Sequence, residues 1–307
     1  MPDLAVPRGI TPFYLPNLPV RGRFVRLGPL ANTLLTRHDH PVPVRRLLGE
    51  ALALAAGLAT ALKFSGSFSL QIKGNGPVPM LLVDCTQLGA LRGYARVDSE
   101  KLSQLAPDES TTARTLLGDG YLAFTVMQTG REPQQGIVAL EGNTLAELAE
   151  YYFATSEQLP CRVYLAAGDT GNGGAGGGWR ASALVLERIA GAGGIDPELS
   201  STEQEEAWRT ACILADTITD EELLDDALPP ERLLFRLFHG EGVAVDKPRS
   251  LAFGCRCSRA RLADILEGFP KDDLDHMAVG GDIVMTCEFC NFDFRFPRDA
   301  VTGKEAP

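Results

Sequence analysis

The chain has 307 residues, a hydrophobic fraction of 45% and a net charge of −11. Its length allows two domains, and its apolar content is typical of a globular protein with a well-formed core. The excess of 40 acidic over 29 basic residues disfavours a nucleic-acid binder, which needs a basic surface to neutralise phosphates. The longest apolar run, residues 51–62, is too short to cross a bilayer and indicates a buried helix. We therefore expect neither nucleic acid nor membrane as a partner.

The N-terminal sequence shows no sign of export. Its first twenty residues contain five prolines and no apolar segment of the signal-peptide kind. The default expectation is a cytoplasmic protein. In that compartment thiols stay reduced, and clustered cysteines more often bind metal or sense oxidants than form structural disulfides.

Residues 1–198 are predicted to form an α+β core domain with a largely antiparallel sheet and packed helices. Apolar and polar residues alternate in the predicted strands, and glycine-containing turns connect them. A helix over residues 44–63 is apolar on almost every side, which indicates burial. Thr144 and Glu147 fit a capping box at the start of another helix. A short helix is predicted over 29–37, and strands over 23–27, 68–72, 78–85, 91–97, 121–127, 136–140, 161–167 and 179–188.

Residues 199–250 are predicted to form an acidic helical linker. Between 200 and 246 there are twelve Asp or Glu and three Arg, a local charge of −9. Thr202 and Glu205 predict a capping box for the first helix, and two short helices are predicted over 219–224 and 229–239. Short helices are marginal in water by themselves. Because their apolar residues recur at helical spacing, we expect them to lie on another surface.

Residues 251–307 are predicted to be a small C-terminal domain. Ser258 can cap a helix over 260–268, and strands over 282–286 and 292–296 flank the sequence CEFC as a hairpin. About fifty residues can hardly build a self-sufficient core. A metal or a disulfide is therefore expected to stabilise this domain.

Four of the seven cysteines lie in this domain, as C-x-C (Cys255, Cys257) and, after a gap of 29 residues, C-x-x-C (Cys287, Cys290). In an extended stretch, residues two apart face the same way, and the hairpin turn can bring the second pair together. Four thiolates in a tetrahedron are typical ligands of structural zinc. His276 lies eleven residues before Cys287 and is predicted to be an exposed residue at a helix end.

The cysteine pattern allows three interpretations. The zinc can be purely structural, since such sites contribute about 10–16 kcal/mol of binding coupled to folding. It can also belong to a switch, because oxidation to disulfides would release the metal and unfold a domain without its own core. A disulfide within C-x-C is strained and labile. Resting disulfides are the third interpretation, and spacing alone does not choose among the three.

The two cysteine motifs, following an acidic helical segment, resemble those of the 33-kilodalton heat-shock protein family, the redox-regulated molecular chaperonins. The resemblance extends to VRGRFVRL, LKFSGSFSLQIKGNGPVPMLLVD, LRGYARV and GIVALEGNTLAELAEYYFATSEQLP, in the order of that family's core domain. These stretches cover residues 20–160. Together with the cysteine motifs they make the resemblance nearly full-length.

The resemblance implies roles for the four cysteines. Cys255, Cys257, Cys287 and Cys290 would bind one Zn²⁺ in the reduced, inactive form, and oxidation would pair Cys255 with Cys257 and Cys287 with Cys290. It further implies an ATP-independent holdase rather than an enzyme. On oxidation its zinc domain and linker would unfold and expose a surface that binds unfolding client proteins. Oxidised members of the family also form homodimers.

Two other functions stay open on the residues alone. One is a constitutive zinc-ribbon adaptor whose acidic arm binds a basic partner. The other is a thiol oxidoreductase, although a four-coordinate zinc site should suppress such turnover. No arrangement of nucleophile and base in the sequence predicts catalysis.

Several further patterns are weaker. GNGGAG at 171–176 fits the dinucleotide fingerprint, but that site needs a βαβ unit, and a hairpin loop is the better interpretation. His38 and His40 form H-x-H beside a proline loop without further ligands, which favours loop structure. The remaining cysteines are predicted to be buried small apolar residues: Cys85, Cys161 and Cys212.

Overall fold

The computed structural model describes residues 4–60, 65–105, 111–171, 177–189 and 200–304. The chain divides into two compact units, Met1–Phe253 and Gly254–Pro307. Within the described ranges, no helix combines the length and apolar character that crossing a bilayer requires. The prediction of three parts, 1–198, 199–250 and 251–307, remains a proposal, since the acidic segment belongs to the first compact unit.

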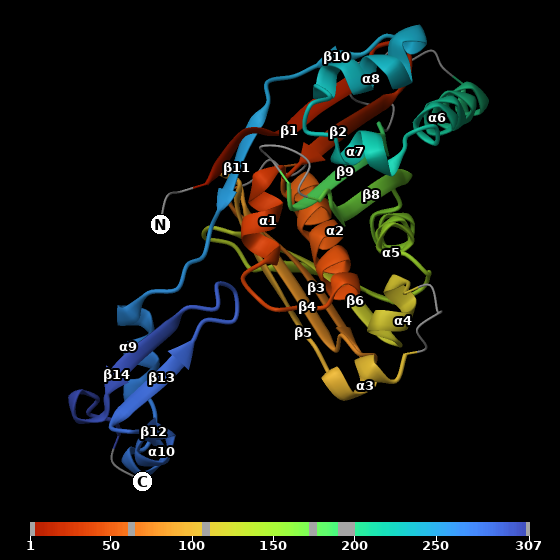
Figure 1. Cartoon of the computed structure of the whole chain (residues 1–307). Helices are drawn as coiled ribbons and strands as arrows, with labels where there is room; N and C mark the ends of the chain where they lie inside the picture. Colours follow the sequence, from red (N-terminus) through yellow and green to blue (C-terminus); the bar gives the residue numbers. More distant parts are fainter. Residues whose placement is uncertain (1–3, 61–64, 106–110, 172–176, 190–199, 305–307) are drawn as a thin grey trace. The chain divides into compact units, whose positions relative to one another are not determined.

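An eleven-stranded sheet forms the frame of the first unit (Figure 1). Its strand order is β7-β6-β3-β4-β5-β11-β1-β2-β9-β8, and β10 pairs with β1. Neighbouring strands are antiparallel except β11 and β5, which are parallel. The predicted α+β class with a largely antiparallel sheet is confirmed. The strands are β1 Ala5–Leu15, β2 Val20–Arg26, β3 Gly66–Gly74, β4 Met80–Thr86, β5 Ala90–Arg96, β6 Gly120–Gln128, β7 Gln134–Ala139, β8 Cys161–Asp169, β9 Trp179–Arg188, β10 Ala244–Val245 and β11 Arg249–Phe253.

One long helix, α2 (Val42–Ala59), packs on the sheet together with α1 (Figure 1). Its buried residues lie on nearly all sides, as its sequence predicts. The prediction extends the helix to residue 63, but residues 61–64 lie outside the described ranges. The capping box of α5 is present as predicted, with Thr144 and Glu147 bonded reciprocally. The other helical elements up to residue 160 are α1 Pro29–Leu35, α3 Ser99–Ser103, α4 Ala113–Leu117, α5 Leu145–Tyr152 and a π-helical turn Phe153–Glu157.

Strand β1 comes from the proline-rich N-terminal residues, for which no element is predicted from the sequence. It lies in the middle of the sheet, between β11 and β2. Its pairing with β11 shifts register between Val6 and Ile10, a stretch that contains Pro7. Because prolines interrupt a hydrogen-bonded ladder and hide strand patterns in a sequence, this central strand was not predicted.

Strands β1, β2, β8 and β9 carry an apolar core on each face. Side chains alternate between faces along a strand, so Ala183 and Val185 join the core under α1 and α2. Leu184 and Leu186 join a second core formed with the acidic segment. These four strands are therefore covered on both sides.

The acidic segment contributes α6 (Ser201–Ala215), α7 (Asp220–Leu224), α8 (Pro230–Phe238) and a 3₁₀ turn, His239–Glu241. The predicted capping box at Thr202 and Glu205 is wrong. Helix α6 begins two residues earlier, where Ser200 accepts the Glu203 N–H and the Glu203 carboxylate accepts the Ser200 N–H. Both pairs have the same spacing, and the helix uses the first one.

The second unit is small. It has a three-stranded sheet, β12-β13-β14, and its buried apolar cluster contains Leu266, Leu274, Ile283, Phe296 and Val301. Ser258 caps α9 as predicted, accepting the Arg261 N–H. The elements are α9 Arg259–Glu267, α10 Lys271–Met277, β12 Ala278–Val279, β13 Asp282–Thr286, β14 Asp293–Pro297 and a 3₁₀ turn Arg298–Ala300.

Candidate metal centre and the acidic helical segment

The four predicted cysteines meet in the second unit. Cys255 and Cys257 lie on the stretch without regular secondary structure that precedes α9, and Cys287 and Cys290 lie in the turn between β13 and β14. The turn is closed by two hydrogen bonds, from the Asn291 N–H to the Cys287 carbonyl and from the Cys287 N–H to the Phe292 carbonyl. Asn291 has a left-handed backbone with φ of 53°, which Asn tolerates better than most residues. The hairpin thus presents both of its thiols to the same point.

The sulfur atoms form a compact group. The Sγ of Cys255 lies 3.3 Å from that of Cys257 and 3.6 Å from that of Cys287, and the Cys257 and Cys290 sulfurs are 3.5 Å apart. All four atoms lie within 4.8 Å of one another. Thiolates at about 2.3 Å from a tetrahedral Zn²⁺ are about 3.8 Å apart, so the donor set fits that ion. All seven cysteines are free, and the interpretation of resting disulfides gains no support.

The thiols of this group differ in pKa. Burial and hydrogen bonds with neighbouring thiols raise the pKa of Cys257, and burial is the largest cause that raises the pKa of Cys290 to about 11. Burial acts in the same direction on Cys255, but hydrogen bonds from the Cys257 backbone and thiol outweigh it and lower its pKa. Four thiolates at these distances repel one another, so a bound cation is what would allow them to ionise together.

The histidines considered from the sequence lie elsewhere. His276 is exposed in the last turn of α10, with its Nδ1 against the Asp272 carbonyl, as predicted. The rings of His38 and His40 stack with centroids 5.1 Å apart, and burial, followed by His38, lowers the pKa of His40 to about 4. Within the described ranges, no second group of three or more metal-ligating side chains is found.

The other three cysteines are protonated thiols at neutral pH. Burial raises the pKa of Cys85 to about 12, that of Cys161 well above its usual value and that of Cys212 to about 11. Cys85 is buried as predicted, but Cys161 and Cys212 are only half-buried. Cys161 begins β8, and Cys212 lies in α6.

The glycine-rich sequence connects two antiparallel strands, β8 and β9. The hairpin interpretation is therefore confirmed, since a dinucleotide fingerprint needs a helix after the first strand. Residues 172–176 themselves lie outside the described ranges.

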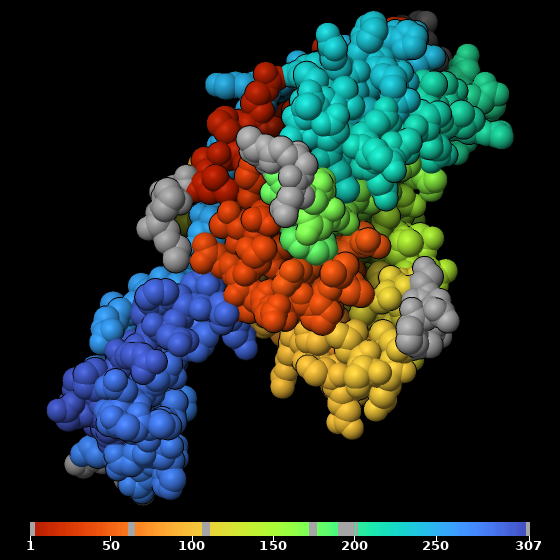
Figure 2. Space-filling view, in the orientation of Figure 1, coloured from red at the N-terminus to blue at the C-terminus, as the bar shows by residue number. Residues whose placement is uncertain are grey.

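The acidic segment covers an apolar face of β1, β2, β8 and β9. Leu233, Leu234 and Phe238 of α8 are buried against it, and the Phe238 ring stacks on Phe13 of β1 with centroids 5.7 Å apart. The sheet side of this core consists of Phe13, Leu15, Leu18, Val20, Phe24, Ala166, Leu184 and Leu186. In Figure 2 the atoms of the segment, drawn in teal and cyan, form one continuous area of the surface. The expectation that the helices need a surface to lie on is met.

Polar groups of the sheet also hold the segment. The buried Arg26 donates to the carbonyls of Leu228 and Glu222 at 2.5 and 3.1 Å. The buried Ser182 hydroxyl donates to the Leu223 carbonyl at 2.6 Å. These bonds satisfy groups that would otherwise be buried without a partner, and they fix α7 and the loop that follows it.

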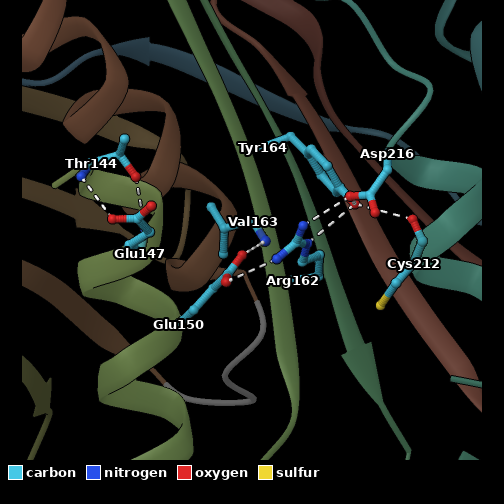
Figure 3. A network of polar contacts seen from close by, with 8 residues as sticks. All are labelled: Thr144, Glu147, Glu150, Arg162, Val163, Tyr164, Cys212 and Asp216. Atoms are coloured by element: carbon cyan, nitrogen blue, oxygen red, sulfur yellow. Dashed lines mark hydrogen bonds and ion pairs between the residues drawn. The ribbon is translucent and has the colours of Figure 1, made fainter. Parts of the chain in front are cut away.

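A further polar network joins α5, β8 and the end of α6 (Figure 3). The Arg162 guanidinium lies between Glu150 at 3.5 Å and Asp216 at 2.9 Å, and the Tyr164 hydroxyl donates to the same Asp216 carboxylate at 2.7 Å. Burial acts against ionisation of Asp216, but the bonds from Tyr164 and Arg162 outweigh it and lower its pKa. The end of α6 is thereby fixed to the sheet.

The strand residues that contact the acidic segment are not predicted from the sequence. Phe13 and Leu15 belong to the proline-rich N-terminus, and their period-2 spacing was the available signal. The contacts of Arg26 and Arg162 with the acidic segment span about 200 and 54 positions of sequence. No local pattern indicates such pairings.

Comparison with known proteins agrees with this geometry. The family model described as "Hsp33 protein" matches residues 9–297. The 33 kDa chaperonin of Caulobacter vibrioides is 40% identical over 301 residues, covering 95% of this chain and 97% of the relative. Those of Ectopseudomonas mendocina and Escherichia coli K12 are 37% and 34% identical and cover 96% and 91% of the chain, and 96% and 89% of their own lengths.

A solved structure shares the fold. The crystal structure of a 33 kDa chaperonin from Thermotoga maritima superposes with a TM-score of 0.76 at 22% identity and covers 96% of both chains. At this identity the likeness supports the fold alone. The family match and the relatives over nearly the whole length carry the classification: the chain belongs to the Hsp33 family of chaperones.

Proposed function

We propose that this protein is a redox-regulated, ATP-independent holdase. In the reduced form one Zn²⁺ is bound by Cys255, Cys257, Cys287 and Cys290, and the protein is inactive. Oxidation of the four cysteines releases the metal, and the C-terminal region and acidic segment leave their folded positions. The uncovered surface then binds unfolding proteins and prevents their aggregation under oxidative or heat stress.

The observation that carries the proposal is the position of the four thiols in a unit with very little core. Its buried apolar cluster has five residues, whereas large apolar side chains such as Val279 and Phe292 are exposed. When bound, zinc supplies four bonds to thiolates and so contributes stability that this core cannot provide. Loss of the thiolates is therefore expected to unfold the unit.

The redox step balances with peroxide as the oxidant. In each pair, two thiolates lose two electrons and form one S–S bond, and hydrogen peroxide takes these electrons with two protons and gives two waters. We propose the pairs Cys255–Cys257 and Cys287–Cys290. The 3.3 Å between the first two sulfurs supports the first pair, and the shared hairpin turn supports the second.

The acidic segment supports the link between unfolding and chaperone activity. Its sequence runs through β10 and β11 to Phe253, two residues before Cys255. Its helices cover apolar side chains of β1, β2, β8 and β9. Release of the helices would expose these side chains, and a contiguous apolar surface is what binds unfolded chains. The charge of the segment would keep it in solution after release.

We further propose a cytoplasmic protein whose partners are unfolding client proteins and, after oxidation, a second copy of itself. It would be neither an enzyme nor a binder of nucleic acid or membranes. The thiol group needs a reducing compartment to remain available for metal, which supports the location.

The test is treatment of the zinc-loaded protein with peroxide at mildly elevated temperature. We expect loss of one zinc and four free thiols together with suppression of the aggregation of a heat-unfolded test protein. The proposal fails if zinc stays bound or if aggregation is not suppressed after its release. If Cys→Ser variants unfold the C-terminal unit while oxidation changes no binding, a constitutive zinc adaptor is the better description.

A further inference from the structure

In the ion pairs between the acidic segment and the sheet, the positive and negative partners are always on the same sides. Four ion pairs join the two, and in each of these four the guanidinium belongs to the sheet and the carboxylate to the segment. Three have distances of 2.9, 2.5 and 2.5 Å. The pairs are Arg8–Glu231, Arg162–Asp216, Arg180–Asp226 and Arg188–Glu205.

These pairs flank the apolar centre of the interface, because Arg180 and Arg188 lie at opposite ends of β9 and Arg162 lies on the edge strand β8. The carboxylates of Glu231, Asp226 and Glu205 all keep partial contact with solvent, whereas Phe13, Phe24 and Leu184 between them are buried. Of the four arginines, Arg162 also has a carboxylate partner on the core side, Glu150. The arginine rim, defined as Arg8, Arg162, Arg180 and Arg188, would thus lose its partners on the segment when the segment leaves.

The acidic segment shows what kind of chain this face of the sheet binds. It is amphipathic, with buried leucines on one side and a net charge of −9 over residues 200–246. A surface that binds such a segment within its own chain is complementary to other segments of the same kind. Exposed ion pairs add little affinity individually, but an ordered rim of one sign disfavours partners of the same charge and fixes position.

We propose that the uncovered face of β1, β2, β8 and β9 binds acidic amphipathic segments of unfolding proteins in preference to neutral or basic segments of equal apolar content. The arginine rim makes this selection. The inference rests on the proposed function, because the face becomes accessible only after the chain's own segment has left it.

The test uses the full-length chain after peroxide oxidation and three labelled peptides that copy residues 203–241 with Cys212→Ser. The first keeps every carboxylate. The second replaces the four that pair with the rim: Glu205→Gln, Asp216→Asn, Asp226→Asn and Glu231→Gln. The third has the same change of net charge at four carboxylates for which the described residues show no ion pair with the sheet: Glu206→Gln, Asp220→Asn, Glu221→Gln and Glu241→Gln.

We expect the second peptide to bind about tenfold more weakly than the first and the third. Added salt should weaken the first and third peptides and bring them toward the second. A chain with Arg8→Gln and Arg188→Gln should lose part of the preference. A chain with Arg96→Gln and Arg131→Gln, two exposed arginines of β5 and the β6–β7 turn, should keep it.

The outcomes separate the inference from the proposed function. Equal binding of the three peptides overturns selection by the rim and leaves the holdase in place. Weakening of the second and third peptides by the same factor also overturns it, because net charge alone would then decide. If the oxidised chain binds none of the peptides, the face is not uncovered, and both the inference and the proposed mechanism fail.

Discussion

The two faces of strands β1, β2, β8 and β9 differ in the helices that cover them. Helix α2 covers one face and is apolar almost all round, with Leu52 and Leu54 fully buried. Helices α6–α8 cover the other face through a narrower apolar side, and four ion pairs flank it. A helix that buries apolar side chains on most of its sides costs much free energy to detach from the core. A helix that buries only a narrow apolar side and is held by ion pairs at its edges costs less. We infer that the second face is the one the molecule can uncover.

The largest expected effect comes from removal of the thiols. The fourfold variant replaces each of the four metal-site cysteines, Cys255, Cys257, Cys287 and Cys290, by serine. It removes the contribution of metal binding to folding, about 10–16 kcal/mol. We expect residues 254–304 to lose their protection against proteolysis while the sheet around α2 stays protected. Limited proteolysis with mass spectrometry measures this. Cys212→Ser is the matched control, and protection of the C-terminal unit in the fourfold variant would contradict the account.

A matched pair of core substitutions tests the two faces directly. Leu52→Ala on α2 and Leu234→Ala on α8 each empty a fully buried site, so each should destabilise its surroundings by about 2–5 kcal/mol. We expect Leu52→Ala to lower the free energy of global unfolding. Leu234→Ala should instead speed hydrogen exchange in α6–α8 and give chaperone activity without oxidation.

If both leucine variants behave alike, the two faces of the sheet do not differ in how easily they are uncovered. Global unfolding caused equally by Leu234→Ala would mean that the acidic segment is as inseparable from the sheet as α2.

Glu50 of α2 gives a prediction for pH dependence. Burial, with a further contribution from Asp220 of α7 and against the effect of Arg46, raises its pKa to about 7. Between pH 4.5 and 7, Glu50 is therefore protonated in the folded state but ionised in the unfolded state. Its contribution to the free energy of unfolding is greatest below pH 4.5 and falls as the pH rises through 7.

Glu50→Gln should therefore stabilise the protein by about 3 kcal/mol at pH 8 and by almost nothing at pH 4. Denaturant unfolding of both proteins at the two pH values measures the difference. A gain of equal size at pH 4 and pH 8 would exclude titration of Glu50 as its cause.

The smallest expected effect belongs to a single pair of the rim. Glu205→Gln removes the partner of Arg188, and an exposed pair of this kind contributes at most about 1 kcal/mol. We expect slightly faster hydrogen exchange in α6 at low salt and no difference at high salt. Glu206→Gln is the control on the same helix. A large effect that persists at high salt would mean that the carboxylate has a structural role beyond the ion pair.

Sequence patterns predicted the elements whose signals are local. The alternation in β3, the capping box of Thr144 and the apolar character of α2 each need only neighbouring residues. The cysteine spacing predicted that four thiols would meet, because turns and extended stretches set such geometry over a few residues.

What the sequence did not reveal has two causes: local signals that are interrupted or overlap, and pairings between distant residues. The position of β1 in the middle of the sheet was hidden by its prolines, and the first capping box of α6 was misplaced by two residues because two equal motifs overlap. The partnership of Arg162 with Asp216 and of Phe13 with Phe238 exists only in the folded chain. These tertiary contacts, rather than any motif, define the surface that the acidic segment covers.

The central claim is that oxidation of the four thiols uncovers the sheet face under α6–α8. Hydrogen exchange with mass spectrometry, before and after peroxide and with zinc release followed in parallel, tests it most directly. We predict that residues 200–246 and 254–304 lose protection together with the metal, while α2 and the strands beneath it keep theirs. Loss of zinc and of four thiols with α6–α8 still protected would contradict the account.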